Sequence, residues 1–323
     1  MHVSAASLEL LGIDIIIYDS SSGGETECVV KNYIIDGLKN VKYIRWSGNF
    51  DGFSLDDKVI DAYKDFSDEY EYIWVHRDGL IIDANAVKRS VLPAVKRNND
   101  FVVVNTTCRD FKNLGNRVYS SPEKLFSEQL IQMTVLGATI IKGELIKNII
   151  ESIPNEKGKT YGLWQPMSIF HYCATKKMSA ESIVDNIWIY NTSAAKSSFW
   201  GKNTLSQWCD MWCDMIWNLP DCYTPYKAKA MYIYMSDFHP FYAENLLAIR
   251  ANGGLTFQEV KKCKDKIKYV CDTNTIVFYL ISCMPVWLAK LVKKYSHTNA
   301  YQSVRVMYYL LFGIVPGEKE ILD

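Results

Sequence analysis

Residues 13–18 read Ile-Asp-Ile-Ile-Ile-Tyr, and residues 19–24 read Asp-Ser-Ser-Ser-Gly-Gly. The short β-branched run predicts a buried strand, and the polar run predicts a loop at the end of that strand. The same alternation continues along the chain, with predicted helices at 25–38, 54–66 and 83–96 and predicted strands at 41–46, 70–75 and 101–104. This order predicts an α/β fold with a mainly parallel sheet and helices on both faces.

The chain changes character toward its C-terminus. Ser121-Pro122-Glu123 is typical of a helix start, since serine caps the helix and proline suits its first position. A further helix is expected over residues 166–176 and a strand over 183–190, after which strand patterns fade. We therefore predict an α/β domain over residues 1–195 and a mainly helical region over residues 196–323.

Composition excludes several classes of protein. The 323 residues include 36 Lys+Arg and 36 Asp+Glu, and this neutral balance argues against a generic nucleic-acid-binding protein. Hydrophobic residues make up 49% of the chain, which argues against disorder. The nine cysteines are scattered and odd in number, as expected for reduced thiols in the cytoplasm. Cys209 and Cys213 have helical spacing, which indicates two buried thiols rather than a zinc site.

Residues 276–288 form the most apolar stretch, and Lys290, Lys293 and Lys294 follow it. The stretch contains Pro285 and is too short to span a bilayer. Two interpretations are open: a helix of the core, or a peripheral contact of residues 276–294 with the inner face of a membrane. In the second case the lysines would face anionic headgroups.

Three polar loops follow predicted strands, at residues 19–26, 47–54 and 76–79. Ligands of open α/β sheets bind beyond the carboxyl ends of the strands, so we expect a ligand site where these loops meet. In the third loop, the His76 imidazole and the Asp78 carboxylate would be able to bind one divalent cation that neutralises a diphosphate. The alternative is that Asp78 caps the turn at Gly79 and His76 merely packs.

Four blocks of sequence resemble family-two glycosyltransferases with the GT-A fold. Residues 15–27 resemble the second strand of that family with its acidic and serine-rich loop, and residues 40–45 resemble the next strand. Residues 54–58 lie where the family has a basic residue at a helix start, and residues 70–78 lie where it has an Asp-x-Asp metal motif.

The resemblance implies transfer of a sugar from a UDP- or dTDP-sugar to a glycan, glycolipid or glycoprotein, as in polysaccharide biosynthesis, with inversion by direct displacement. It also implies a Mg²⁺ or Mn²⁺ ion, with His76 and Asp78 as ligands. Asp19 would take the position that contacts uracil, and Lys58 would approach the nucleotide or diphosphate. The donor site implied in this way consists of Asp19, Ser20, Ser21, Lys58, Arg77 and Asp78. Two tryptophans, Trp164 and Trp200, are candidates for stacking on the acceptor sugar, with core packing as the alternative.

Three departures from the family pattern stand out. The first strand of the family has no counterpart, so either the start is truncated or another segment takes its place in the sheet. His76 replaces the first carboxylate of the metal motif. Trp164-Gln165 lies where the family has its catalytic Glu-Asp pair, so the catalytic base is unassigned. These departures favour a second hypothesis, a non-catalytic glycosyltransferase-like subunit that stabilises an active partner. A nucleotidyltransferase would need a Gly-rich phosphate loop, which the N-terminal sequence lacks.

Overall fold

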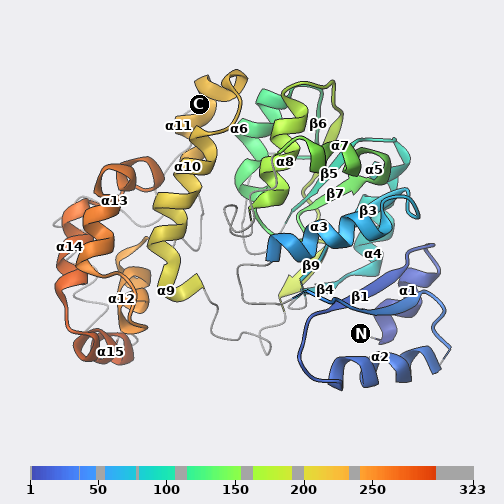
Figure 1. Ribbon diagram of the computed structural model, residues 1–323, viewed down its shortest axis with the longest axis horizontal. Coiled ribbons are helices and arrows are strands. Elements are labelled where there is room, and N and C mark those ends of the chain that lie inside the picture. The colour runs from blue at the N-terminus through green and yellow to red at the C-terminus, as the bar shows by residue number, and fades with distance from the viewer. Residues whose placement is uncertain are drawn as a thin grey trace. The chain divides into compact units, whose positions relative to one another are not determined.

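The computed structural model describes residues 2–35, 37–48, 55–77, 80–105, 115–153, 163–190, 200–232 and 241–295. The chain forms two compact units (Figure 1). The first contains every strand described, helices α1 to α8, and helices α10 and α11. The second contains α9 and the helices from α12 to α15.

The strands form three separate sheets. Their bounds are β1 Ile15–Asp19, β2 Val41–Arg45, β3 Tyr72–Trp74, β4 Leu80–Ile82, β5 Phe101–Val104, β6 Arg117–Tyr119, β7 Thr139–Lys142, β8 Ala180–Ile183 and β9 Trp188–Tyr190. β1 pairs with β2, β4 pairs with β9, and the remaining strands form a five-stranded sheet in the order β3-β7-β5-β8-β6.

The predicted α/β class is confirmed, and the sheets are mixed in direction. β1–β2 and β5–β8 are parallel, whereas β3–β7, β5–β7, β6–β8 and β4–β9 are antiparallel. In the five-stranded sheet the reversed strands are β6, of 3 residues, and β7, of 4 residues. The prediction contained neither of these two strands, so it described a sheet that was too strongly parallel.

Both units contain helices. In the first unit they are α1 His2–Glu9, α2 Glu25–Ile35, α3 Leu55–Phe66, α4 Ala84–Ala86, α5 Leu92–Lys96, α6 Pro122–Met133, α7 Ile146–Glu151, α8 Trp164–Cys173, α10 Trp212–Trp217 and α11 Thr224–Met231. Those of the second are α9 Trp200–Leu205, α12 Ala243–Ala251, α13 Phe257–Val270, α14 Thr275–Cys283 and α15 Val286–Tyr295. The predicted cap of α6 is confirmed, because the Lys124 amide donates to Ser121 Oγ at 3.2 Å.

The sheet is interrupted between β1 and β3. Among the described residues, β1 makes strand pairing with β2 alone, and β3 is the first strand of a different sheet. Side chains bridge the interruption, since Ile15 of β1 packs in one apolar cluster with Trp74 of β3 and Leu8 of α1. Leu8 of α1 therefore belongs to the apolar cluster beside the interruption, and among the described residues no strand pairs with both β1 and β3.

The predicted division at residue 195 needs a correction. Helices α10 and α11 belong to the first unit, although the sequence placed them in the C-terminal region. The cause is aromatic packing: the Tyr223 ring lies 4.7 Å from Phe126 and 5.6 Å from Phe170, and its hydroxyl donates to the Phe170 carbonyl at 2.9 Å. Cys209 and Cys213 are fully buried, as their spacing predicts.

Candidate nucleotide-sugar site

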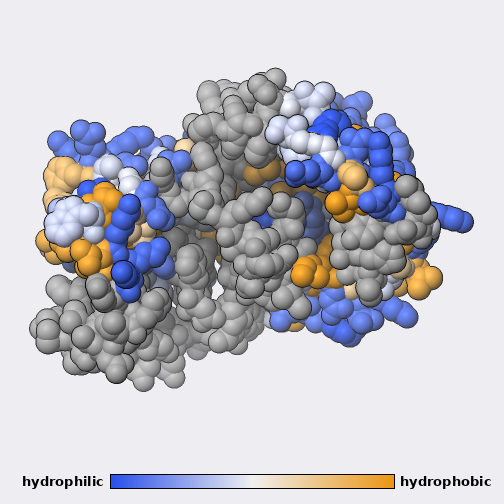
Figure 2. Space-filling model, turned by 90° about the horizontal axis from the view of Figure 1, so that it is seen from below, coloured by the Kyte–Doolittle hydropathy of each residue, from blue (hydrophilic) through white to orange (hydrophobic). Residues whose placement is uncertain are grey.

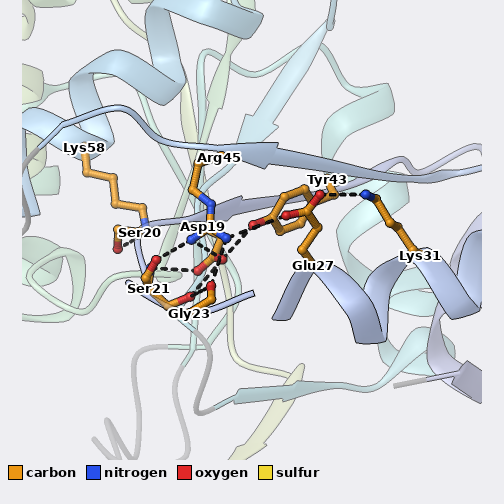
Figure 3. A network of polar contacts seen from close by, with 9 residues as sticks. All are labelled: Asp19, Ser20, Ser21, Gly23, Glu27, Lys31, Tyr43, Arg45 and Lys58. Atoms are coloured by element: carbon orange, nitrogen blue, oxygen red, sulfur yellow. Dashed lines mark hydrogen bonds and ion pairs between the residues drawn. The ribbon is translucent and has the colours of Figure 1, made fainter. Parts of the chain in front are cut away.

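The candidate site centres on Asp19, the last residue of β1 (Figure 3). Its carboxylate is only 8% exposed and accepts three hydrogen bonds. Two come from Ser21, through the backbone amide and the hydroxyl, both at 2.9 Å. The third comes from the Tyr43 hydroxyl at 2.8 Å. Asp19 therefore holds the start of the following loop against the neighbouring strand.

Arg45 completes this arrangement from the end of β2. The parallel register pairs it directly with Asp19, and its guanidinium lies 3.3 Å from that carboxylate. The same guanidinium donates to the carbonyls of Ser21 and Gly23, the latter at 2.9 Å, and lies 3.7 Å from Glu27. Arg45 thus holds the serine–glycine loop in a curve around its own charge.

Lys58 reaches the loop from the N-terminal part of α3. Its ammonium group donates to Ser20 Oγ at 2.9 Å, so a positive charge lies beside the first serine of the loop. The structure therefore brings together four residues that the sequence singled out, Asp19, Ser20, Ser21 and Lys58. Tyr43 and Arg45 complete the cluster, and the sequence analysis did not assign them to the site. Their position opposite Asp19 and its neighbours in a parallel strand pair was the signal that could have found them.

The electrostatics of the cluster keep Asp19 ionised. Burial alone raises the pKa of this carboxyl, but the hydrogen bonds from Ser21 and Tyr43 and the charge of Arg45 outweigh burial and lower the pKa below its usual value. Burial and the hydrogen bond to Asp19 raise the pKa of Tyr43, so the phenol remains a donor. Both oxygens of Asp19 accept hydrogen bonds from the protein, and Oδ1, with the Ser21 amide as its donor, retains capacity for one further donor.

His76 follows β3 and packs between two tryptophans. Its ring lies 4.3 Å from that of Trp74 and 5.6 Å from that of Trp188, which is fully buried. Both ring nitrogens are buried and have no hydrogen-bond partner among the described residues. Burial, together with the nearby charge of Arg77, lowers the pKa of His76 to about 4. The imidazole is therefore neutral at physiological pH, which is the form that binds metal ions.

The metal site, predicted with His76 and Asp78 as ligands, stays a prediction. Across the described ranges there is no group of three or more His, Cys, Asp or Glu side chains that would hold a metal ion. Asp78, the other predicted ligand, lies outside the described residues. Arg77 is described and exposed. Of the two predicted ligands, the structure thus describes His76 alone, as a neutral imidazole in an apolar setting.

The two predicted acceptor-binding tryptophans differ in what the structure describes. Trp164 is only 4% exposed, and its ring packs 6.2 Å from that of Tyr63. This is the core-packing alternative, and it leaves little of the ring for a sugar to contact. Trp200 begins α9, and its side chain lies outside what the structure describes.

The start of α8 lies against α3, a contact that the sequence did not predict. The Trp164 amide donates to the buried carboxylate of Asp56 at 3.2 Å. Gln165 and Asp56 line the same small hollow, and Gln165 Nε2 is buried without a hydrogen-bond partner among the described residues. An amide therefore lies where the family resemblance implies a catalytic carboxylate.

Comparison with known proteins gives a limited result. Neither a family model nor a curated protein matches the sequence. Among solved structures, the chain is similar to S. aureus TarS 1–349, with a TM-score of 0.49 and 12% identity over 83% of this chain and 80% of that chain. The complex of the same fragment with UDP-GlcNAc has a TM-score of 0.45 and 14% identity, over 91% of this chain and 83% of that chain. The complex of the fragment with UDP has a TM-score of 0.45 and 11% identity, over 87% of this chain and 81% of that chain.

Proposed function

We propose that this chain is a glycosyltransferase that moves a sugar from a UDP- or dTDP-sugar to a glycan, glycolipid or glycoprotein acceptor. The observation that supports this function is the polar loop at the carboxyl end of β1. Asp19 and Arg45 hold that loop in place, and Lys58 lies against it from α3. A preorganised loop at this edge of an α/β fold is a typical binding position for a nucleotide.

Each part of the cluster has a role in this proposal. The Ser20 hydroxyl, which accepts from Lys58, would donate its own proton to the nucleotide, and the Lys58 ammonium would approach the diphosphate. During transfer, an acceptor hydroxyl oxygen attacks the anomeric carbon while the bond from that carbon to the diphosphate oxygen breaks. The acceptor proton passes to a base, which we leave unassigned. A positive charge beside the departing diphosphate stabilises the negative charge that develops there.

Asp19 acts mainly by shaping the loop in this proposal. The carboxylate is only 8% exposed and already accepts three hydrogen bonds, so little of it is open to the uracil contact that the family resemblance implies. The hydrogen bonds of Asp19 therefore favour positioning of the loop over direct recognition.

A Mg²⁺ or Mn²⁺ ion remains a proposal, with His76 and Asp78 as its ligands. When bound, such an ion would neutralise charge on the diphosphate. Of the two proposed ligands, the structure describes His76 alone. The transfer step above therefore assigns no role to the ion. Titration of Mn²⁺ into the wild-type protein and the His76→Ala variant, followed by calorimetry without nucleotide, tests the ligand assignment.

The experiment that tests the function is calorimetric titration of UDP, dTDP and UDP-GlcNAc into three proteins: wild type, Lys58→Met and Lys64→Met. Lys64 is an exposed residue of the same helix and serves as the matched control. A hydrogen bond between charged groups is worth about 1.5–3 kcal/mol, so Lys58→Met should weaken nucleotide binding about tenfold or more. Lys64→Met should leave it unchanged. Absence of binding to every nucleotide, or equal affinities of the two variants, would contradict the proposal.

A second function is favoured by one observation, the amide of Gln165 at the start of α8. If no carboxylate acts as base, the chain would bind a nucleotide sugar without transferring the sugar, and would stabilise an active partner. The two functions differ in a simple measurement. A transferase hydrolyses its donor slowly when alone, whereas a non-catalytic subunit hydrolyses none and copurifies with a partner.

A further inference from the structure

Helices α14 and α15 form an apolar surface in the second unit. On α14 the exposed side chains are Ile276, Leu280 and Cys283, which recur at helical spacing and therefore share one face. Ile276 is 63% exposed and Leu280 is 66% exposed. The exposed face of α14 thus contains no charged residue along this line.

The opposite face of α14 is firmly packed. Phe278 is fully buried and its ring lies 5.6 Å from that of Phe241, while Val277 and Ile281 are also buried. At the end of the helix, Arg250 Nε donates to the Met284 carbonyl at 2.7 Å. The helix therefore has its own core face, and the exposed leucine and isoleucine are an additional apolar surface.

On α15 the exposed apolar residues alternate with lysine. Trp287 is 64% exposed and Leu291 is 43% exposed, one turn apart, and Lys290 is exposed between them. Lys293 and Lys294 follow in the last turn. Figure 2 shows apolar and hydrophilic atoms side by side on this unit, at the left of the view. A tryptophan and leucines beside lysines are typical of helices that lie in a membrane interface.

The geometry favours a helix pair lying on a membrane over one that crosses it. Within the described residues no single helix is long and apolar enough to span a bilayer. The two helices satisfy the length and composition of a span only together, and they are bent by 106° at the break between them. Short helices that each expose apolar side chains, with lysines on the second, suit shallow insertion among headgroups.

We propose that the exposed faces of α14 and α15 bind an anionic lipid surface. Ile276, Leu280 and Trp287 would enter the interface, and Lys290 would extend its ammonium to the phosphates while its methylenes remain among the acyl chains. A protein partner fits less well, because lysine is depleted in the buried centres of protein interfaces. This contact is independent of the proposed glycosyl transfer.

The test is cosedimentation of the whole chain with phosphatidylcholine vesicles, with and without phosphatidylglycerol. We expect binding to the anionic vesicles alone. Leu280→Glu should weaken that binding more than tenfold, because it removes an inserted side chain and adds a repelled charge. Val118→Glu, at a residue of β6 that is 68% exposed, makes the same chemical change elsewhere and should have no effect.

A second pair of variants tests the charge. One lysine beside an anionic surface contributes about fivefold to affinity, so the reversal Lys290→Glu should weaken binding about tenfold or more. Lys264→Glu, at an exposed position of α13, makes the same change in net charge and should leave vesicle binding nearly unchanged. Light scattering compares the molecular mass of the wild type with that of Leu280→Glu, and so tests whether this surface instead joins two copies of the chain. Equal binding to neutral vesicles, no binding to either kind, or a dimer that Leu280→Glu dissociates would each overturn the proposal.

Discussion

Replacement of Asp19 by asparagine tests the central feature of the candidate site. The carboxylate is almost completely buried and accepts three hydrogen bonds, two from Ser21 and one from Tyr43. Asparagine is nearly the same size, so the change removes the charge and one acceptor with little change in packing. The side-chain amide would also direct N–H groups toward donors that now point at Asp19.

The magnitude follows from the bonds that are weakened. A hydrogen bond to a charged group is worth about 1.5–3 kcal/mol and a neutral one about 1 kcal/mol, so three such changes cost about 2 kcal/mol. Loss of the half-exposed ion pair with Arg45 adds about 0.5 kcal/mol. For a unit of this size we expect Asp19→Asn to lower Tm by about 5–10 °C.

The assay is thermal unfolding followed by circular dichroism at neutral and acid pH. Folding lowers the pKa of Asp19, so the carboxylate stabilises the fold above its unfolded pKa, about 3.9, and this contribution is lost as pH falls below that value. The difference in Tm between the wild type and Asp19→Asn should therefore become smaller below about pH 4. Asp68→Asn, at an exposed position, is the control. If Asp19→Asn and the control variant have the same Tm at neutral pH, the Asp19 carboxylate does not hold the loop.

Two further predictions concern buried titratable groups. Folding depresses the pKa of His76 to about 4, so the unfolded chain binds more protons than the folded chain between pH 4 and about 6.5. The free energy of unfolding should therefore decrease by about 1.4 kcal/mol for each unit by which the pH is lowered in this range. Urea titrations across this pH range should show that the free energy of unfolding depends less steeply on pH in His76→Phe than in the wild type. Equal slopes would contradict a depressed pKa for His76. Lys227 is buried and donates to the carbonyls of Trp217 and Leu219 at 3.0 and 2.5 Å. Lys227→Met should therefore lower the free energy of unfolding by about 2 kcal/mol in the same titrations, and Lys229→Met, at an exposed position, should not.

Much of the local structure was predictable because its causes are local. Ile15–Asp19 and Val41–Arg45 are β-branched or aromatic runs with clear ends, and the cap at Ser121 lies within a few residues of what it caps. Asp83 likewise caps the helix over residues 84–96, through a hydrogen bond to the Asn85 amide. Patterns of this kind need no knowledge of the rest of the chain.

The parts that the sequence did not predict depend on contacts between distant residues. Arg45 joins the site because the parallel register places it opposite Asp19, and Asp56 meets the Trp164 amide across 108 positions of sequence. His76 is neutral because it is buried, and Trp188, 112 positions away in the sequence, is one of the rings that pack against it. Motif spacing alone contains no record of such neighbours.

The interrupted sheet gives the polar cluster a structural role as well as a functional one. A two-stranded sheet is at best marginally stable alone, and among the described strands β1 and β2 pair with each other only. The contacts of Asp19 with Tyr43 and Arg45 join the ends of exactly these two strands, and the Tyr18 hydroxyl donates to Asp65 of α3 at 2.7 Å. Because backbone pairing is limited to one edge, side chains must hold β1 and β2 to the rest of the unit. Substitutions in the candidate site should therefore change stability and ligand binding together, and the two effects separate only when binding is measured well below Tm.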